Sequence, residues 1–149
     1  MSTYAVINIV TNICDNVIAM GDTLGEWTPP AGHYAVNIDG LSVGIGYYYD
    51  PATQVWSEPP TITASFSPSP IFLTQTTTLT WDASYATSVT LDGEPVTSSG
   101  TKDYTPTAIG TQSVLLIATG LAGTAKASAS VRVVSTQAEL DSPYAPTVL

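Results

Sequence analysis

The chain alternates apolar and polar residues in short runs, and almost no stretch shows the 3.6-residue spacing of an amphipathic helix. In residues 77–81, Leu79 and Trp81 fall on one side and the intervening threonines fall on the other. The runs are separated by Gly, Pro, Asn and Asp, which are the residues that end strands and form turns. The sequence therefore predicts an all-β protein.

A domain boundary is expected at Pro59-Pro60, because two consecutive prolines supply no backbone donor and no sheet continues through them. Before it, residues 1–58 are predicted to form a small β-meander module. A module of this size is marginally stable alone, so a partner or a neighbouring copy is expected to cover part of it. Its expected strands are 4–10, 16–20 and 33–38, followed by a hairpin of 43–49 and 54–56.

Residues 60–135 are predicted to form a two-sheet β-sandwich of roughly seven short strands, because their apolar residues lie on one side of each run. The pattern is clearest at 127–133, where alternate positions are apolar and the positions between them are Ser or Arg. The last segment, 136–149, contains Pro143 and Pro146 and no strand pattern, so we expect an extended C-terminal arm.

The stretch 113–118 breaks this alternation. If the residues at even positions point inward, Leu115 and Ile117 point outward, although burying each fully is worth about 1.5–3 kcal/mol. We therefore predict a docking face there, and cover by a loop or by the N-terminal module is an equally open alternative. The candidate partner contacts are Leu115 and Ile117, with Tyr144, Val148 and Leu149 in the arm.

Aromatic residues gather in the N-terminal module. Tyr47 and Tyr49 share one side of an expected strand, and Trp56 lies on the partner strand, which is typical of a cross-strand cluster. Trp27 lies in the long loop before them. We predict an aromatic cluster of these four residues with a core or interface role, and a platform for stacking a sugar ring is the alternative.

The charge balance is strongly acidic, with twelve acids against three bases and a net charge of −9. Such a surface repels phosphate, so neither nucleic acid nor an anionic membrane is expected as a partner. The N-terminus lacks the basic and apolar regions of a secretory signal, and no apolar run approaches the ~18 residues of a membrane span. We expect synthesis in a host cytoplasm and release by lysis.

Few residues offer chemistry. The single histidine, His33, cannot build a metal cluster, and no nucleophile motif accompanies it. The single cysteine, Cys14, cannot form an intramolecular disulfide and is expected to pack as a small apolar group. We predict no cofactor, no metal and no catalytic residue. A hydrolase using His33 as its base, or a glycosidase with paired carboxylates, is the catalytic alternative.

Residues 60–135 resemble the disulfide-free immunoglobulin-like domains of bacteria and phages. The matching residues are Leu79-Thr80-Trp81, the Ser-Val-Thr-Leu-Asp-Gly run at 88–93, Gly100 and the corner at 118–125. The resemblance covers roughly half of the chain and implies an immunoglobulin-like β-sandwich. Such domains serve adhesion, spacing and capsid decoration alike, so the fold does not select one role.

The N-terminal module resembles a unit that recurs in structural proteins of tailed phages. The matching residues are Tyr4-Ala5-Val6-Ile7, Asn16-Val17-Ile18, the hairpin from Gly44 to Asp50, and the closing Pro59-Pro60. The chain departs from this unit at Tyr47, where Trp is common, and in its long loop at 21–32.

The two resemblances imply a virion structural protein. The expected function is non-catalytic decoration or cementing of the assembled capsid, with the major capsid protein or other virion proteins as partners. We expect a homo-oligomer located in the virion. The alternative is a tail or fibre component, with glycan binding as an adhesin as its lesser option.

Overall fold

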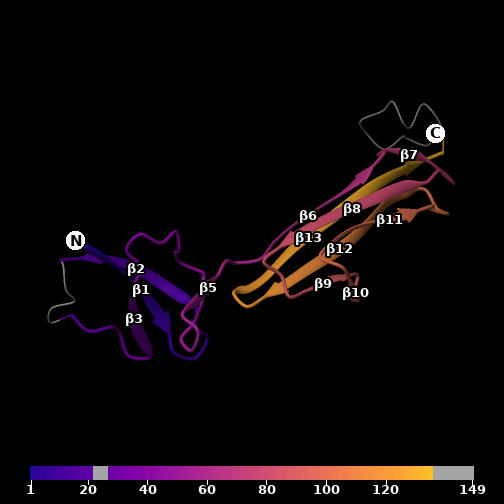
Figure 1. Cartoon of the computed structure of the whole chain (residues 1–149). Helices are drawn as coiled ribbons and strands as arrows, with labels where there is room; N and C mark the ends of the chain where they lie inside the picture. The colour runs from indigo at the N-terminus through magenta and orange to yellow at the C-terminus, as the bar shows by residue number, and fades with distance from the viewer. Residues whose placement is uncertain (22–26, 136–149) are drawn as a thin grey trace. The chain divides into compact units, whose positions relative to one another are not determined.

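The structure is a computed structural model that describes residues 1–21 and 27–135 (Figure 1). These residues form thirteen strands and no helix, so the all-β prediction is confirmed. None of the described segments forms a helix of the length and apolarity that crossing a membrane requires. The chain divides into two compact units. The first contains Met1–Pro60 and also the short segment Gly120–Thr124, and the second contains the other described residues from Thr61 onward. The predicted arm at 136–149 lies outside the described residues.

The first unit contains a three-stranded antiparallel sheet and a separate hairpin. The sheet has the order β2-β1-β3, so β1 lies in the middle. The hairpin is shorter than the sequence suggested, because Gly46 adopts a φ of 92° and turns the chain before the strand begins. The elements are β1 (Ser2–Asn8), β2 (Cys14–Met20), β3 (His33–Asn37), β4 (Tyr48–Asp50) and β5 (Val55–Ser57).

Backbone hydrogen bonds attach this hairpin to the start of β2. The Gly46 amide donates to the Cys14 carbonyl at 2.8 Å, and the Cys14 amide donates to the Tyr47 carbonyl at 2.9 Å. The Cys14 side chain is buried, and burial raises the pKa of its thiol. The small core of the unit is thereby closed on one side, and its buried members are Ala5, Ile7, Cys14, Ile38 and Tyr49.

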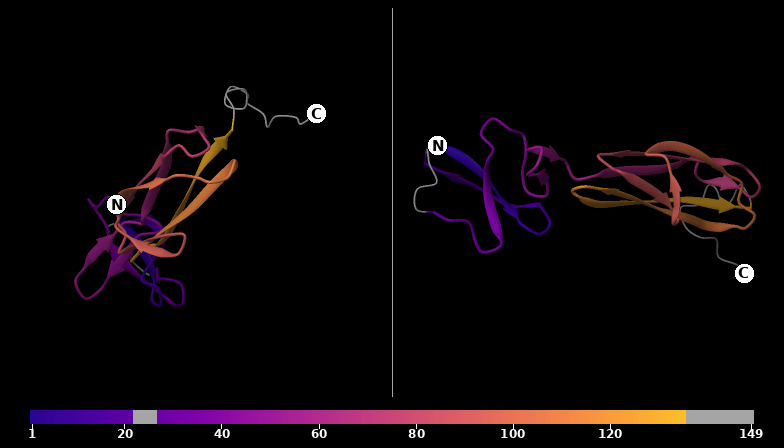
Figure 2. Two further views of the ribbon diagram at one scale, coloured as in Figure 1. Left: turned by 90° about the vertical axis from the view of Figure 1, so that its right-hand side faces the viewer. Right: turned by 60° about the horizontal axis from the view of Figure 1, so that its bottom comes forward.

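The second unit is a sandwich of two sheets (Figure 2). One has the order β11-β8-β6, and the other has the order β10-β9-β12-β13-β7, with β7 parallel to β13. This distribution of strands is that of an immunoglobulin-like β-sandwich. The elements are β6 (Thr61–Ser67), β7 (Ile71–Phe72), β8 (Thr77–Ser84), β9 (Ser88–Leu91), β10 (Glu94–Val96), β11 (Ser99–Tyr104), β12 (Gly110–Gly120) and β13 (Gly123–Val134).

The sandwich core takes its largest residues from both sheets. Leu79 and Trp81 of β8 pack in one cluster with Leu116 of β12, and each is at most 5% exposed. Thr77 is the buried polar residue of this unit, and its hydroxyl donates to the Pro68 carbonyl at 2.6 Å. A buried hydroxyl with such a partner avoids the cost of an unmade hydrogen bond.

The Trp81 ring requires a glycine on the neighbouring strand. Gly100 of β11 lies directly opposite Trp81 in the β11–β8 register. A Cβ at Gly100 would come within 2.9 Å of the Trp81 Cζ2 atom. The indole Nε1 donates to the Thr97 carbonyl at 2.9 Å, so the ring is held on the side from which the clash would come.

Replacing Gly100 with Ala should therefore destabilise the sandwich by about 1–3 kcal/mol, because the ring has no room to move away. Denaturant unfolding measures the change. The same replacement in a Trp81→Leu background should cost less, because the clashing ring is gone. An equal cost in both backgrounds would show that the effect comes from the β11 backbone and not from the ring.

Candidate functional site

The candidate interaction surface is the outward face of the five-stranded sheet. On β12, Val114, Leu116 and Ala118 are buried, while Leu115 between them is 42% exposed and Ile117 is half-buried. The structure thus places Leu115 and Ile117 on the solvent side of the strand. Both are apolar side chains on a surface where Ser and Thr otherwise predominate.

Small residues of β9 and β10 surround this pair on one side. Thr90 of β9 lies opposite Ile117, and Pro95 of β10 lies opposite Thr90. Thr90 is half-buried and Pro95 is exposed. Thr90 and Pro95 have small side chains, so they do not keep a partner surface away from Ile117.

The neighbouring strand on the other side is β13. The hydroxyls of Ser113 and Ser130 are 2.9 Å apart, so these residues lie opposite each other on the outward face. Alternation is unbroken along both strands between these residues and the β12–β13 turn. Counting in steps of two from that pair places Ser128 beside Leu115 and Lys126 beside Ile117.

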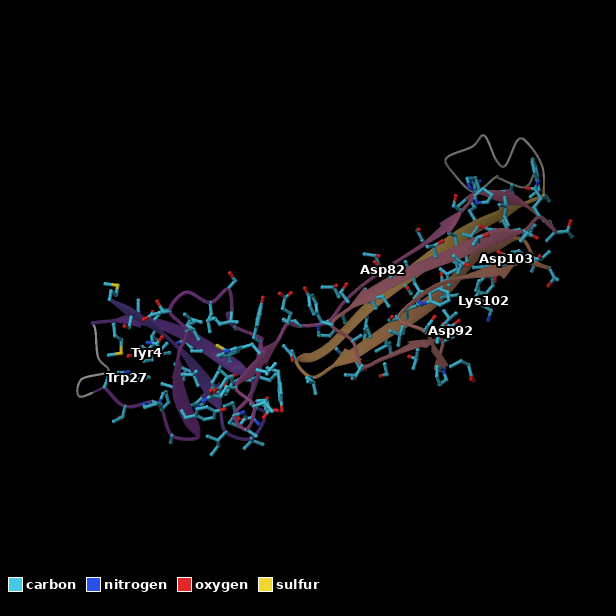
Figure 3. The ribbon with its side chains drawn as sticks, viewed as in Figure 1. Tyr4, Trp27, Asp82, Asp92, Lys102 and Asp103 are labelled. Atoms are coloured by element: carbon cyan, nitrogen blue, oxygen red, sulfur yellow. The ribbon has the colours of Figure 1, made fainter. Side chains whose placement is uncertain are left out.

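The backbone of Leu115 is fixed at both polar atoms by Asp92, which is labelled in Figure 3. The Leu115 amide donates to the Asp92 carboxylate at 2.8 Å, and the Asp92 amide donates to the Leu115 carbonyl at 2.8 Å. Asp92 and Gly93 both have positive φ, as the tight turn between β9 and β10 requires. The side chain of Leu115 is thus presented from a rigid position, which lowers the entropic cost of binding through it.

A hollow of about 220 Å³ lies within the second unit and is lined by residues of both sheets, among them Asp92 and the inward-facing Val114 and Val131. Phe66 and Tyr104 line it and contact each other edge to face, with ring centroids 5.4 Å apart. Burial, with a smaller effect of the Asp92 charge, raises the pKa of the Tyr104 phenol. The ionisable residues in its lining are Asp92 and Tyr104, and the Asp92 carboxylate already accepts from the Leu115 amide.

The predicted aromatic cluster is partly assembled. Tyr49 lies opposite Trp56 in the β4–β5 register, and their ring centroids are 4.6 Å apart. Tyr34 of β3 joins them, at 6.4 Å from the Tyr49 ring, and its hydroxyl donates to Asn12. Tyr34 was missed from the sequence, although it shares one side of its strand with Val36, which was a usable signal.

The other two predicted members play different parts. Tyr47 precedes β4 and is half-buried, and its backbone carbonyl accepts a hydrogen bond from the Cys14 amide. Trp27 is half-buried, and no ring pair among the described residues includes it. Tyr49 is only 7% exposed, so the assembled part of the cluster serves packing better than sugar stacking. Tyr144, Val148 and Leu149 lie outside the described residues.

An ion pair that the sequence did not suggest joins two strands of the first sheet. His33 Nε2 lies 2.8 Å from the Asp15 carboxylate, and His33 Nδ1 lies 3.1 Å from the Ala31 carbonyl. Asp15 is the extra residue of a β-bulge, since Val6 pairs with Asn16 and the next residue of β1 pairs with Cys14. A bulge turns its extra side chain to a new direction, and no sequence pattern revealed it.

The protonation of this pair follows from its partners. Both acceptors around the imidazole are oxygen atoms, so both ring nitrogens are satisfied only when each carries a proton. The hydrogen bond to Asp15 raises the pKa of His33, and the hydrogen bond from His33 lowers the pKa of Asp15. Among the described residues, no group of three or more His, Cys, Asp or Glu side chains is arranged to hold a metal ion.

Comparison with known proteins adds little to this description. No protein-family model matches the sequence, and no curated protein matches it. A solved structure of fibronectin(III)-like modules of CbhA from Clostridium thermocellum is similar over 50% of this chain and 100% of the other, with 16% identity and a TM-score of 0.33. The assignment of the sandwich rests on its own strand order.

The His33 pair should contribute stability over a limited pH range. Because the pKa of His33 is raised, the stabilisation from its protonated ring is complete below the ordinary pKa of 6.5. This stabilisation is lost as pH rises through the pKa in the folded state. The lowered pKa of Asp15 makes the stabilisation from this carboxylate complete above pH 3.8, and that stabilisation is lost as pH falls through the pKa in the folded state.

NMR titration of His33, the sole imidazole, should give a midpoint above 6.5, and Asp15→Asn should lower this midpoint. Asp82→Asn, which removes the same charge from the second unit, should leave the midpoint unchanged. Equal midpoints in the wild type and Asp15→Asn would show that the pair does not form in solution.

Proposed function

We propose that this chain is a non-catalytic structural protein of a tailed-phage virion that decorates or cements the assembled capsid. The observation that carries the proposal is the outward placement of Leu115 and Ile117 on a strand whose inward residues are buried. The resemblance of the N-terminal module to a unit of phage structural proteins supports the same assignment. The major capsid protein or another virion protein is the proposed partner, and the proposed location is the virion.

The energetics suit a role performed by binding alone. Leu115 is 42% exposed and Ile117 is half-buried, so covering them on binding would contribute only a part of the about 1.5–3 kcal/mol that full burial of each side chain is worth. Together the two side chains could still supply a useful fraction of a micromolar affinity. A ligand that binds only the assembled shell opposes its disassembly by mass action. The net charge of −9 repels free copies from one another before they reach the shell.

The proposed organisation assigns separate tasks to the units. The second unit presents two neighbouring apolar side chains on one sheet face, whereas in the first unit Tyr49 is buried and Tyr34 and Trp56 pack against the same small core. The face of the second unit is therefore the proposed capsid contact. A homo-oligomer on the shell follows if neighbouring copies cover the remaining exposed apolar residues of the first unit, among them Val10 and Ile45.

Co-sedimentation with capsids assembled without this chain tests the proposal. The wild type should bind, and a Leu115→Thr, Ile117→Thr double variant should bind at least tenfold more weakly, because two apolar contacts are lost while strand propensity is kept. Leu121→Thr is the matched control, since Leu121 is 57% exposed but lies in the β12–β13 turn.

Two results would count against the assignment. Equal binding by the double variant and the control would show that another surface makes the contact. Failure of the wild type to bind capsids, together with its presence in purified tails, would move the protein to the tail or fibre alternative.

A further inference from the structure

The bases of this chain are distributed unevenly. Six of its twelve acids precede Thr61, and all three of its bases follow it. Two of the three, Lys126 and Arg132, lie on β13 at positions that face outward. They therefore share the sheet face that carries Leu115 and Ile117.

This face carries cations and no carboxylate on its three central strands. The outward positions of β9, of β12 and of β13 between Thr124 and Arg132 are otherwise Ser, Thr, Leu and Ile. The carboxylate of Asp92, in the turn that follows β9, accepts a hydrogen bond from the Leu115 amide. Lys126 is exposed and lies beside Ile117, so its charge stands next to the apolar centre of the face.

We infer that this face binds a protein surface that is apolar at its centre and carries carboxylates beside that centre. The inference rests on the proposed function and names the chemistry of the capsid surface that would be recognised. Charge complementarity indicates that the partner is negatively charged at the contact, because this face carries cations although the chain as a whole has a net charge of −9. Without a local cation, an acidic partner would meet only repulsion.

Screening by salt explains why one or two cations on this face can attract an acidic partner although the chain carries twelve acids. At physiological salt the Debye length is about 8 Å, so acids farther away on the chain are largely screened from the contact. Lys126 at the contact is within that distance of its partner. An exposed ion pair contributes only about 0.2–1 kcal/mol, but reversing the charge replaces this attraction with a repulsion, so a charge reversal should have a larger effect than the loss of the pair alone.

The test compares two charge reversals that change the net charge equally. Lys126→Glu alters the proposed face, and Lys102→Glu alters β11 in the other sheet, where the Lys102 ammonium lies 5.3 Å from the centre of the Tyr104 ring (Figure 3). Binding to capsids assembled without this chain is measured at about 50 mM and about 500 mM sodium chloride, which differ in Debye length by roughly threefold. Thermal unfolding of each variant checks that it folds.

Lys126→Glu should weaken binding about five- to tenfold at low salt, and the difference from wild type should shrink at high salt. Lys102→Glu should bind as the wild type does. If wild type binds and both variants bind equally well, or weaken equally, the inference is overturned and the proposed function stands. If wild type does not bind at either salt concentration, the proposed function fails and the inference fails with it.

A second copy of the chain is the competing occupant, because the first unit is acidic and exposes apolar residues. Sedimentation velocity of the pure chain separates the two cases. Self-association that Lys126→Glu abolishes would assign the face to a second copy and overturn the capsid partner. A monomer at the concentrations used for capsid binding supports the inference.

Discussion

The position of the Trp81 ring is the constraint on which the second unit depends. Its indole fills the space between the sheets, bonds to the Thr97 carbonyl, and leaves room only for a glycine opposite it. Because side chains alternate along a strand, a core built on Trp81 fixes which residues of the facing β12 point inward. Val114, Leu116 and Ala118 take those places, and Leu115 and Ile117 are left outside. The exposed pair is thus a consequence of how the core is filled.

The parts of the fold that alternation controls were predictable from sequence. The inward side of residues 77–81 and of 127–133 followed from apolar periodicity, and the all-β class followed with it. What could not be predicted depends on a single inserted residue. The bulge at Asp15 breaks the register of β1 and β2, and it brings that carboxylate to His33 across 18 positions of sequence. Periodicity describes regular strands, so it has no signal for such an insertion.

The first hairpin shows a second limit. The predicted hairpin strand at 43–49 contains Gly44 and Gly46, but the strand begins only at Tyr48. The positive φ of Gly46 lets the chain turn so that its amide reaches Cys14. A glycine in a strand pattern is compatible with either outcome, and the choice is made by a partner that lies far away in sequence. The aromatic residues around it therefore end as packing for a small core, with Tyr49 enclosed between Tyr34 and Trp56.

The exposed apolar side chains are arranged differently in the two units, and this difference affects which unit is suited to binding a partner. In the first unit, the exposed residues Ile9, Val10, Leu41 and Ile45 lie outside the strands, whereas Val55 lies on β5, and Val10 is 85% exposed. A single turn residue offers little continuous area, although the side chain of Asn8 orders this turn by accepting from the Val10 and Thr11 amides. In the second unit, Leu115 and Ile117 lie two residues apart on one strand, so their areas are contiguous and neighbouring strands extend the same plane. Contiguous area on a rigid sheet can be buried in one step by a flat partner, whereas scattered turn residues need a partner shaped to each of them. The flat face of the second unit is for this reason the stronger candidate for a contact repeated many times on a regular shell.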